Sequence, residues 1–265
     1  MGRSLQGKLD ALYRELETLQ PGLIAVSGGV DSRFLLHAAL SRGLRYQAVF
    51  FSGPHQGAAD KEYAVRWLVS QPVPFHVMYV DLLQVEGVGD NSELRCYFCK
   101  QALFRHARTL GRQLGLESIL EGSQADDTGE YRPGLRALRE LGIKSPLATA
   151  GLSKKEIRGA ARKLGLERPD QPSRPCLLTR FSYGFAPTPR DLALVTRAEE
   201  LLFEAGFASF RIRVLPGRVV LQLAEEEKDR FHQKGAAVVQ HVKTLGLTID
   251  EILFTQRVSG FFDQA

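Results

Sequence analysis

Short apolar runs alternate with amphipathic patterns through the first two-thirds of the chain. The apolar runs predict buried strands at 22–26, 45–51, 74–82 and 117–122. Apolar residues at helical spacing predict helices at 32–40, 58–71, 99–115 and 153–166, with a further amphipathic helix before the first strand. This alternation predicts an α/β fold with a mostly parallel, doubly wound sheet, whose ligands bind beyond the carboxyl ends of the strands.

The pattern changes after a proline-rich stretch. A helix, a hairpin around Pro216–Gly217, a second helix and a last strand follow, which predicts a small α+β unit. We therefore expect three parts: a sheet domain at 1–168, a linker at 169–188 that carries Cys176, and a small domain at 189–265. The small domain is too short to be more than marginally stable alone, so we expect it to pack on a neighbour.

Composition places the protein among ordinary globular chains. Of its 265 residues, 44% are hydrophobic and 25% are charged. The sequence contains neither an apolar run long enough to span a membrane nor the apolar core of a signal peptide, so a cytoplasmic protein without a membrane partner is expected. The net charge of +5 suits small anionic ligands. Nucleic acid is not favoured as a partner, because Lys and Arg are spread out rather than gathered with aromatic residues.

The segment Ser27–Ser32 reads S-G-G-V-D-S between a predicted strand and a predicted helix. Free backbone N–H groups and the positive end of the helix dipole meet at such a loop, so an anionic phosphate is the natural occupant. Gly28 and Gly29 let the backbone approach closely, and the serines add hydroxyl donors. Asp31 suits this site if a divalent cation bridges it to the phosphates. The alternative is an ordinary strand-to-helix turn with Asp or Ser as N-cap.

The chain contains three cysteines, Cys96, Cys99 and Cys176, among polar or proline-rich neighbours. Three thiols are one ligand short of a zinc site but sufficient for an iron–sulfur cluster with one open iron. Cys176 could instead be a free nucleophile, its pKa lowered by Arg174 or Arg180. The remaining alternative is that all three are small buried hydrophobic residues.

Two sets of motifs resemble known families. The S-G-G-V-D-S string resembles the PP-loop of the N-type ATP pyrophosphatases, which have an adenine nucleotide alpha hydrolase-like fold. RCYFCK at 95–100, EGSQADDTGEYRPGLRA at 121–137, KSPL at 144–147, LSKKEIRGAARKLGL at 152–166 and PCLLTRFSYG at 175–184 follow in order. Together they resemble the ATP-dependent sulfur transferases of the LarE family, which help to build the nickel-pincer nucleotide cofactor.

The resemblance implies a reaction. A carboxylate of a pyridinium biscarboxylate mononucleotide is adenylated by ATP with Mg²⁺, pyrophosphate leaves, and sulfur displaces AMP to give a thiocarboxylate. Some members sacrifice the sulfur of the P-C-L cysteine, whereas others use a [4Fe–4S] cluster on that cysteine and a C-x-x-C pair. With all three cysteines present, this chain resembles the cluster-bearing kind.

The resemblance also implies roles for individual residues. Cys176 and Asp31 are the candidate catalytic residues, and Cys96, Cys99 and Cys176 the candidate cluster ligands. The candidate ATP contacts are Ser27, Gly28, Gly29, Val30, Asp31, Ser32, Ser52 and Gly122. Asp127, one of two adjacent carboxylates after a predicted strand, joins Asp31 as a candidate Mg²⁺ ligand. The candidate substrate contacts are Arg180, Arg211, Arg213 and Arg257. Gln222 departs from the family, which usually has glutamate there.

Several alternatives stay open. A tRNA thiolase of the same superfamily would explain the positive charge, and a non-sulfur PP-loop ligase would make the cysteines incidental. A nucleotide-binding regulator would need no turnover. For Arg211 and Arg213, which alternate along one strand, the alternative is an exposed edge strand made soluble by charge. The small domain is also a candidate contact between copies in a homo-oligomer.

Overall fold

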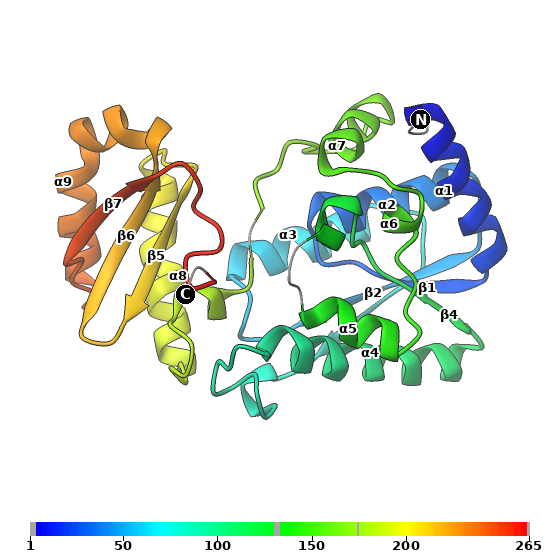
Figure 1. The fold of residues 1–265 in the computed structure, drawn as a ribbon, viewed down its shortest axis with the longest axis horizontal. Helices are drawn as coiled ribbons and strands as arrows, with labels where there is room; N and C mark the ends of the chain where they lie inside the picture. The colour runs from blue at the N-terminus through cyan, green and yellow to red at the C-terminus, as the bar shows by residue number, and fades with distance from the viewer. Residues whose placement is uncertain (1–3, 130–132, 174, 264–265) are drawn as a thin grey trace.

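The computed structural model describes residues 4–129, 133–173 and 175–263. Their strands form two sheets, one within a large α/β domain and one within a small domain beside it (Figure 1). The segment between α7 (Lys154–Lys163) and α8 (Pro189–Glu204) runs from one domain to the other.

The large sheet has four parallel strands in the order β3-β2-β1-β4. They are β1 (Gly22–Ala25), β2 (Tyr46–Ser52), β3 (Phe75–Tyr79) and β4 (Ser118–Leu120). The chain builds outward from β1 to β3 and then returns to the other side of β1. A crevice therefore opens at the carboxyl ends of β1 and β4, where the order reverses. This arrangement confirms the predicted α/β class.

Helices cover both faces of this sheet because its strands are apolar on both sides. Ile24 and Phe50 pack with α1 (Leu5–Leu19), α2 (Val30–Ser41), α3 (Ala58–Val69) and α7. Leu23 and Phe51, one residue away on each strand, pack with α4 (Arg95–Leu114) on the opposite face. The side-chain period of two in a strand produces this division. Two short helices, α5 (Pro133–Glu140) and α6 (Pro146–Thr149), complete the domain.

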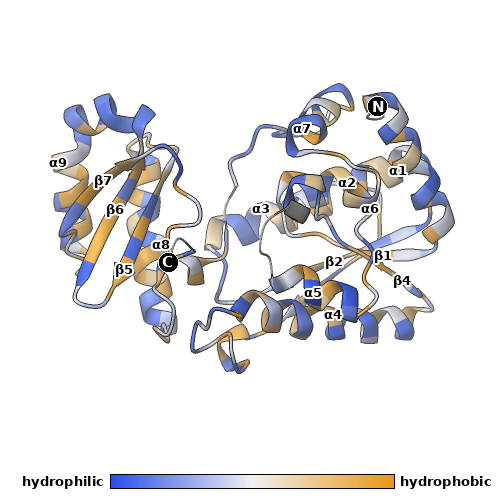
Figure 2. Cartoon of the chain, in the orientation of Figure 1, coloured by the Kyte–Doolittle hydropathy of each residue, from blue (hydrophilic) through white to orange (hydrophobic). Residues whose placement is uncertain are grey.

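The small domain packs two helices against a three-stranded sheet of order β5-β6-β7. The hairpin of β5 (Phe210–Leu215) and β6 (Arg218–Ala224) turns at Gly217, whose φ of 74° favours glycine. After α9 (Lys228–Thr244), β7 (Glu251–Thr255) pairs in parallel with β6. Figure 2 shows hydrophobic residues along β5 and β6, and those that are buried pack with α8 and α9.

The junction between the domains is packed rather than extended. The short 3-10 helix Leu177–Arg180 contributes buried residues to one apolar cluster that runs from Leu23 to Ile212. Phe181 also forms a β-bridge with Val214 of β5. The second half of the predicted linker is therefore a structural joint, whereas residues 169–173 and 175 line the cleft described below.

Among the described residues, no helix combines the length and the apolar character that crossing a membrane requires.

Candidate functional site

A cleft of about 1280 Å³ lies between the carboxyl ends of the large sheet and the small domain. Its lining brings together segments that are far apart in sequence. They include Ser27–Ser32, Glu121–Ser123, Asp127, Lys154, residues 168–173, Pro175–Leu177, and part of α8 with Arg211. The predicted phosphate loop and Cys176 therefore face the same space.

The loop Ser27–Ser32 is shaped by its own short side chains. Ser32 Oγ accepts a hydrogen bond from Ser27 N at 3.1 Å and donates to Gly29 O at 3.1 Å. Gly28 has a φ of 83°, and a Cβ there would lie 2.9 Å from Ala64 Cβ. No side chain caps α2 at Gly29, so the first amide groups of the helix keep their capacity to bind an anion.

Gly122 lies directly behind this loop. A Cβ at Gly122 would come within 2.8 Å of Ser32 N and 3.2 Å of the carbonyl carbon of Asp31. Glycine is therefore required for the end of β4 to approach the start of α2. Ser52, also predicted to contact ATP, is not part of the cleft lining, although its neighbour Phe51 is.

Asp31 is held between a cation and a second carboxylate. Lys154 Nζ donates to Asp31 Oδ2 at 2.5 Å, whereas Oδ1 is buried and has no hydrogen-bond partner among the described residues. Burial raises the pKa of Asp31, and the nearby charge of Asp127 raises it further, against the opposing effect of Lys154. Two carboxylates that repel each other, one with an orphaned oxygen, form a donor set that suits Mg²⁺.

A buried acid stands beside the loop. Glu121 is only 4% exposed, and its carboxylate accepts from Ser145 Oγ at 2.6 Å and from Ser123 N at 2.9 Å. Lys100 Nζ lies 3.4 Å from the same carboxylate and also faces the cleft. This network holds a cation near the place where phosphates would bind.

The three cysteines come from two segments. Cys96 and Cys99 lie one turn apart on α4, which begins at Arg95, four residues earlier than predicted, so both thiols share a helix face. Cys176 precedes the 3-10 helix Leu177–Arg180. Desolvation raises the pKa of Cys99 to about 12, with further contributions from Cys176 and Cys96. The sulfurs are therefore close enough to influence one another.

The structure corrects the expectation of a lowered pKa for Cys176. Burial raises the pKa of this thiol to about 11, and Cys96 adds to the rise, although Arg95 and Arg180 oppose it. Arg174 lies outside the described residues. Cys176 is half-buried and lines the cleft, and a thiol with this pKa stays protonated at neutral pH and is a weak nucleophile without further activation.

No set of three or more His, Cys, Asp or Glu side chains within the described ranges is arranged to hold a metal ion. The ligand roles of Cys96, Cys99, Cys176, Asp31 and Asp127 therefore stay predictions. For the thiols, the donor chemistry still fits a cluster, because the cysteines of a cluster bind different irons and need not converge on one point.

The guanidinium of Arg180 is bound by other protein groups rather than left open to a ligand in the cleft. Its Nε and Nη2 pair with both carboxylate oxygens of Glu199 at 2.9 and 2.8 Å. Its Nη1 donates to Pro175 O at 2.9 Å, and the whole residue is 3% exposed. Arg180 therefore fixes the backbone that carries Cys176, although it also forms part of the cleft wall.

Of the other three arginines predicted to contact the substrate, one lines the cleft and two do not. Arg211 lines the cleft and donates to Ser173 O at 2.7 Å. Arg213 is buried, donates to Thr179 O at 2.7 Å, and binds Gln222 and Val258 as well. Neither Arg213 nor Arg257 is part of the cleft lining. Arg213 has almost no exposed surface to offer a substrate, because burial and alternative partners hold it in the small domain. The substrate contact of Arg257, which is exposed, stays a prediction.

Sequence reasoning missed two residues of the cleft lining, Lys154 and Glu121, and a buried residue behind it, Arg33. Lys154 and Glu121 lie within quoted motifs, and Arg33 directly follows the phosphate loop. Their positions in or next to these motifs were the only signal in the sequence that could have identified them. Their partners come from distant segments, so the roles depend on the tertiary structure.

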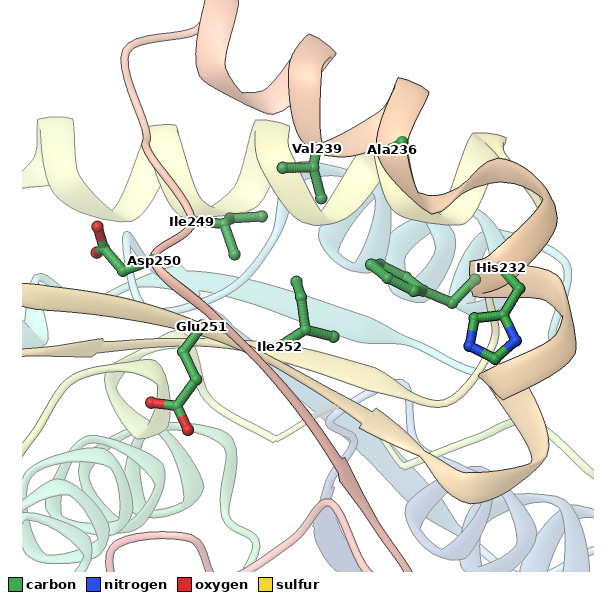
Figure 3. A pocket seen from close by; sticks show the side chains of 8 residues that line it. His232, Ala236, Val239, Ile249, Asp250, Glu251 and Ile252 are labelled. Atoms are coloured by element: carbon green, nitrogen blue, oxygen red, sulfur yellow. The ribbon is translucent and has the colours of Figure 1, made fainter.

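A second hollow of about 400 Å³ lies on the small domain between α9 and β7 (Figure 3). Val239, Ile249 and Ile252 contribute apolar side chains to its lining, with the acidic residues Asp250 and Glu251 at one end. It contains none of the predicted site residues, so the larger cleft is the better candidate.

Comparison with known proteins gives relatives that cover most of the chain. An uncharacterized protein of Synechocystis sp. is 33% identical over 86% of both chains. The pyridinium-3,5-bisthiocarboxylic acid mononucleotide synthase of Lactiplantibacillus plantarum is 26% identical over 92% of this chain and 89% of its own. An uncharacterized protein of Methanocaldococcus jannaschii is 27% identical over 84% of this chain and 85% of its own. No protein-family model matches the chain.

Proposed function

Because the chain belongs to the LarE family, we propose that it is an ATP-dependent sulfur transferase acting on a small carboxylated nucleotide. The named relative makes pyridinium-3,5-bisthiocarboxylic acid mononucleotide. We therefore take the corresponding carboxylated nucleotide as the class of acceptor for this chain. The observation that carries the proposal is that the loop Ser27–Ser32, hereafter the phosphate loop, and Cys176 line the same cleft.

The first step is adenylation of the acceptor. A carboxylate oxygen of the acceptor attacks the α-phosphorus of ATP, the bond from that phosphorus to the bridging oxygen breaks, and pyrophosphate leaves. The amide groups at the start of α2 and the ammonium of Lys154 stabilise the negative charge of the departing pyrophosphate. Mg²⁺, when bound, would supply further charge neutralisation and would be held by Asp31 and Asp127.

The second step transfers sulfur. A sulfur nucleophile attacks the carbonyl carbon of the acyl adenylate, the bond from that carbon to the phosphate oxygen breaks, and AMP leaves. A cluster on Cys96, Cys99 and Cys176, when bound, would supply sulfide at this step. If Cys176 supplies its own sulfur, the thioester that it forms loses Hα as a proton, Cβ–S breaks, and dehydroalanine remains with the thiocarboxylate.

Charge at the cleft supports a small substrate over RNA. The acidic side chains of Glu62, Glu200 and Glu204 line it beside the cations. A polyanion would meet repulsion from these carboxylates, whereas a mononucleotide fits between them and the phosphate loop. Steep salt dependence of tRNA binding would contradict this interpretation and favour the thiolase.

The test separates the two steps in one pair of assays. We expect pyrophosphate release from ATP to require a carboxylated acceptor. We expect Cys176→Ala to release pyrophosphate at the wild-type rate while forming no thiocarboxylate. If thiocarboxylate formation survives in this variant, the sulfur role of Cys176 is wrong.

Anaerobic purification distinguishes the two sulfur sources. Iron and sulfide, with absorbance near 400 nm, are expected in the wild-type chain and are expected to be lost in Cys99→Ala, which leaves Cys176 in place. Absence of iron from both proteins, with loss of one H₂S from the mass of the wild-type chain after turnover, would assign the sulfur to Cys176 itself.

A further inference from the structure

Arg33 is a fully buried cation at the start of α2, directly after the phosphate loop. Its side chain has no exposed surface, and burial lowers its pKa. The hydrogen bonds that it donates go to neutral oxygens and not to a carboxylate. Burying a charge without a bonded acid is unfavourable, so the four bonds call for a reason beyond simple packing.

One arm of the guanidinium reaches into the phosphate loop. Arg33 Nε donates to Gly28 O at 3.0 Å. Because the guanidinium is buried, the Gly28 carbonyl that it binds points into the protein and away from the cleft. If the peptide between Gly28 and Gly29 rotated, its carbonyl oxygen would face the phosphates, and one N–H donor would be lost from the loop.

The other arms hold the segment that leads to Cys176. Nη1 donates to Glu167 O at 2.6 Å, and Nη2 donates to Arg168 O at 3.2 Å and to Gln171 Oε1 at 2.9 Å. The guanidinium lies 5.2 Å from the ring centre of Tyr63, and that of Arg168 lies 4.6 Å from the same ring. The side chain therefore bridges the loop to residues 167–171, of which 168–171 line the cleft.

We propose that Arg33 is a positioning residue that orients the Gly28 carbonyl away from the triphosphate and docks the Cys176-bearing segment on the phosphate loop. The proposal rests on the proposed function for the identity of the ligand. A lysine at position 33 would keep the charge but could not span both sets of acceptors, because its ammonium is a single point.

The first test measures ATP affinity of the full chain by calorimetry, without an acceptor. We expect Arg33→Lys to weaken ATP binding by about tenfold, the effect of losing one charged hydrogen bond that orients the loop. Arg42→Lys is the matched control: Arg42 ends the same helix and lies 4.1 Å over Tyr13, outside the cleft lining. We expect the control to bind ATP within twofold of the wild type.

The second test isolates the segment that carries Cys176. Gln171→Ala removes one acceptor of Arg33 and leaves the bond to Gly28 intact. We expect fewer thiocarboxylates formed for each pyrophosphate released. Because Gln171 also lines the cleft, this ratio is the readout, since a change in ATP affinity or in KM for the acceptor does not by itself alter it. A purely structural role would lower stability without changing this ratio.

The outcomes separate the inference from the proposed function. Failure of the wild-type chain to bind ATP would contradict the proposed function itself. Wild-type ATP affinity in Arg33→Lys, or an equal loss in Arg42→Lys, would overturn the inference while leaving the function standing. Should Arg33→Lys unfold, an unchanged product ratio in Gln171→Ala would overturn it.

Discussion

The phosphate loop after β1 and the arginines of β5 were both predicted to form the site, yet only the first lies wholly at the cleft. All residues from Ser27 to Ser32 line it. On β5, Arg211 lines the cleft, whereas Arg213 is buried against Gln222 and Val258. The loop is built by contacts within six residues. The arginines depend on more distant partners. Arg213 binds Thr179 and Val258, 34 and 45 residues away, and Arg211 binds Ser173, 38 residues away.

The difference shows for which kind of motif the geometry can be predicted from the sequence alone. A strand-to-helix loop brings its own geometry, because glycine conformation and serine hydrogen bonds are local. A pair of arginines at alternate positions fixes only a shared side of one strand. Whether that side is open to a substrate depends on what packs over it.

The largest expected effect lies in the loop. Asp31→Ala removes the carboxylate bound by Lys154 and the buried Oδ1, so pyrophosphate release should fall by about 10²–10³-fold. Acceptor-dependent pyrophosphate release at saturating ATP measures it. Asp10→Ala, on the outer helix α1 and hydrogen-bonded to Gln6, is the control and should keep full activity. Equal activity in both variants would remove Asp31 from the site.

The next largest effect concerns His55, which follows β2 at the carboxyl end of the sheet. Burial and Lys61 lower the pKa of His55 from 6.5 to about 4, against the effect of Asp81. Between these values the unfolded chain binds a proton that the folded chain does not, so stability should fall as pH falls from 6.5 to 4. The loss is about 3 kcal/mol at pH 4. Urea unfolding across this range should show a flatter pH dependence in His55→Gln, and parallel curves would contradict the assignment.

The two arginines of β5 give the direct test of the comparison. Arg213→Gln leaves several buried acceptors without a donor and should lower the free energy of unfolding by about 2 kcal/mol, with KM for the acceptor unchanged. Arg211→Gln should raise that KM by about tenfold with little change in stability. Denaturant unfolding and steady-state kinetics on both variants measure this. The reverse pattern would restore Arg213 as the substrate ligand.

The smallest effect concerns two glycines. Gly122→Ala would place a methyl group 2.8 Å from Ser32 N, which should cost about 1–2 kcal/mol of stability and weaken ATP binding. Gly159→Ala lies in the interior of α7, and no atom beyond its chain neighbours and the helix backbone lies within 4 Å of the added methyl. It should instead stabilise the chain by up to about 1 kcal/mol. Thermal unfolding and ATP titration compare them. Similar shifts in both would mean that the approach of β4 to the loop is not tight.

The sequence by itself determined the order of strands and helices, the parallel class of the sheet and the loop Ser27–Ser32. Apolar periodicity and the glycine and serine residues of the loop act over a few neighbouring residues, so they can be read without knowing the fold. The same local reasoning misplaced the start of α4 by four residues, because Arg95 begins the helix without a side-chain cap.

Only the tertiary structure decided how the pieces meet. It brought Cys176 to the cleft of the phosphate loop, paired Lys154 with Asp31, and enclosed Arg33 and Arg213 among distant carbonyl groups. These outcomes depend on burial and on partners up to 138 residues away in the chain, as between Arg33 and Gln171. Local patterns cannot encode such contacts, because the free energy that selects them arises from packing the whole chain.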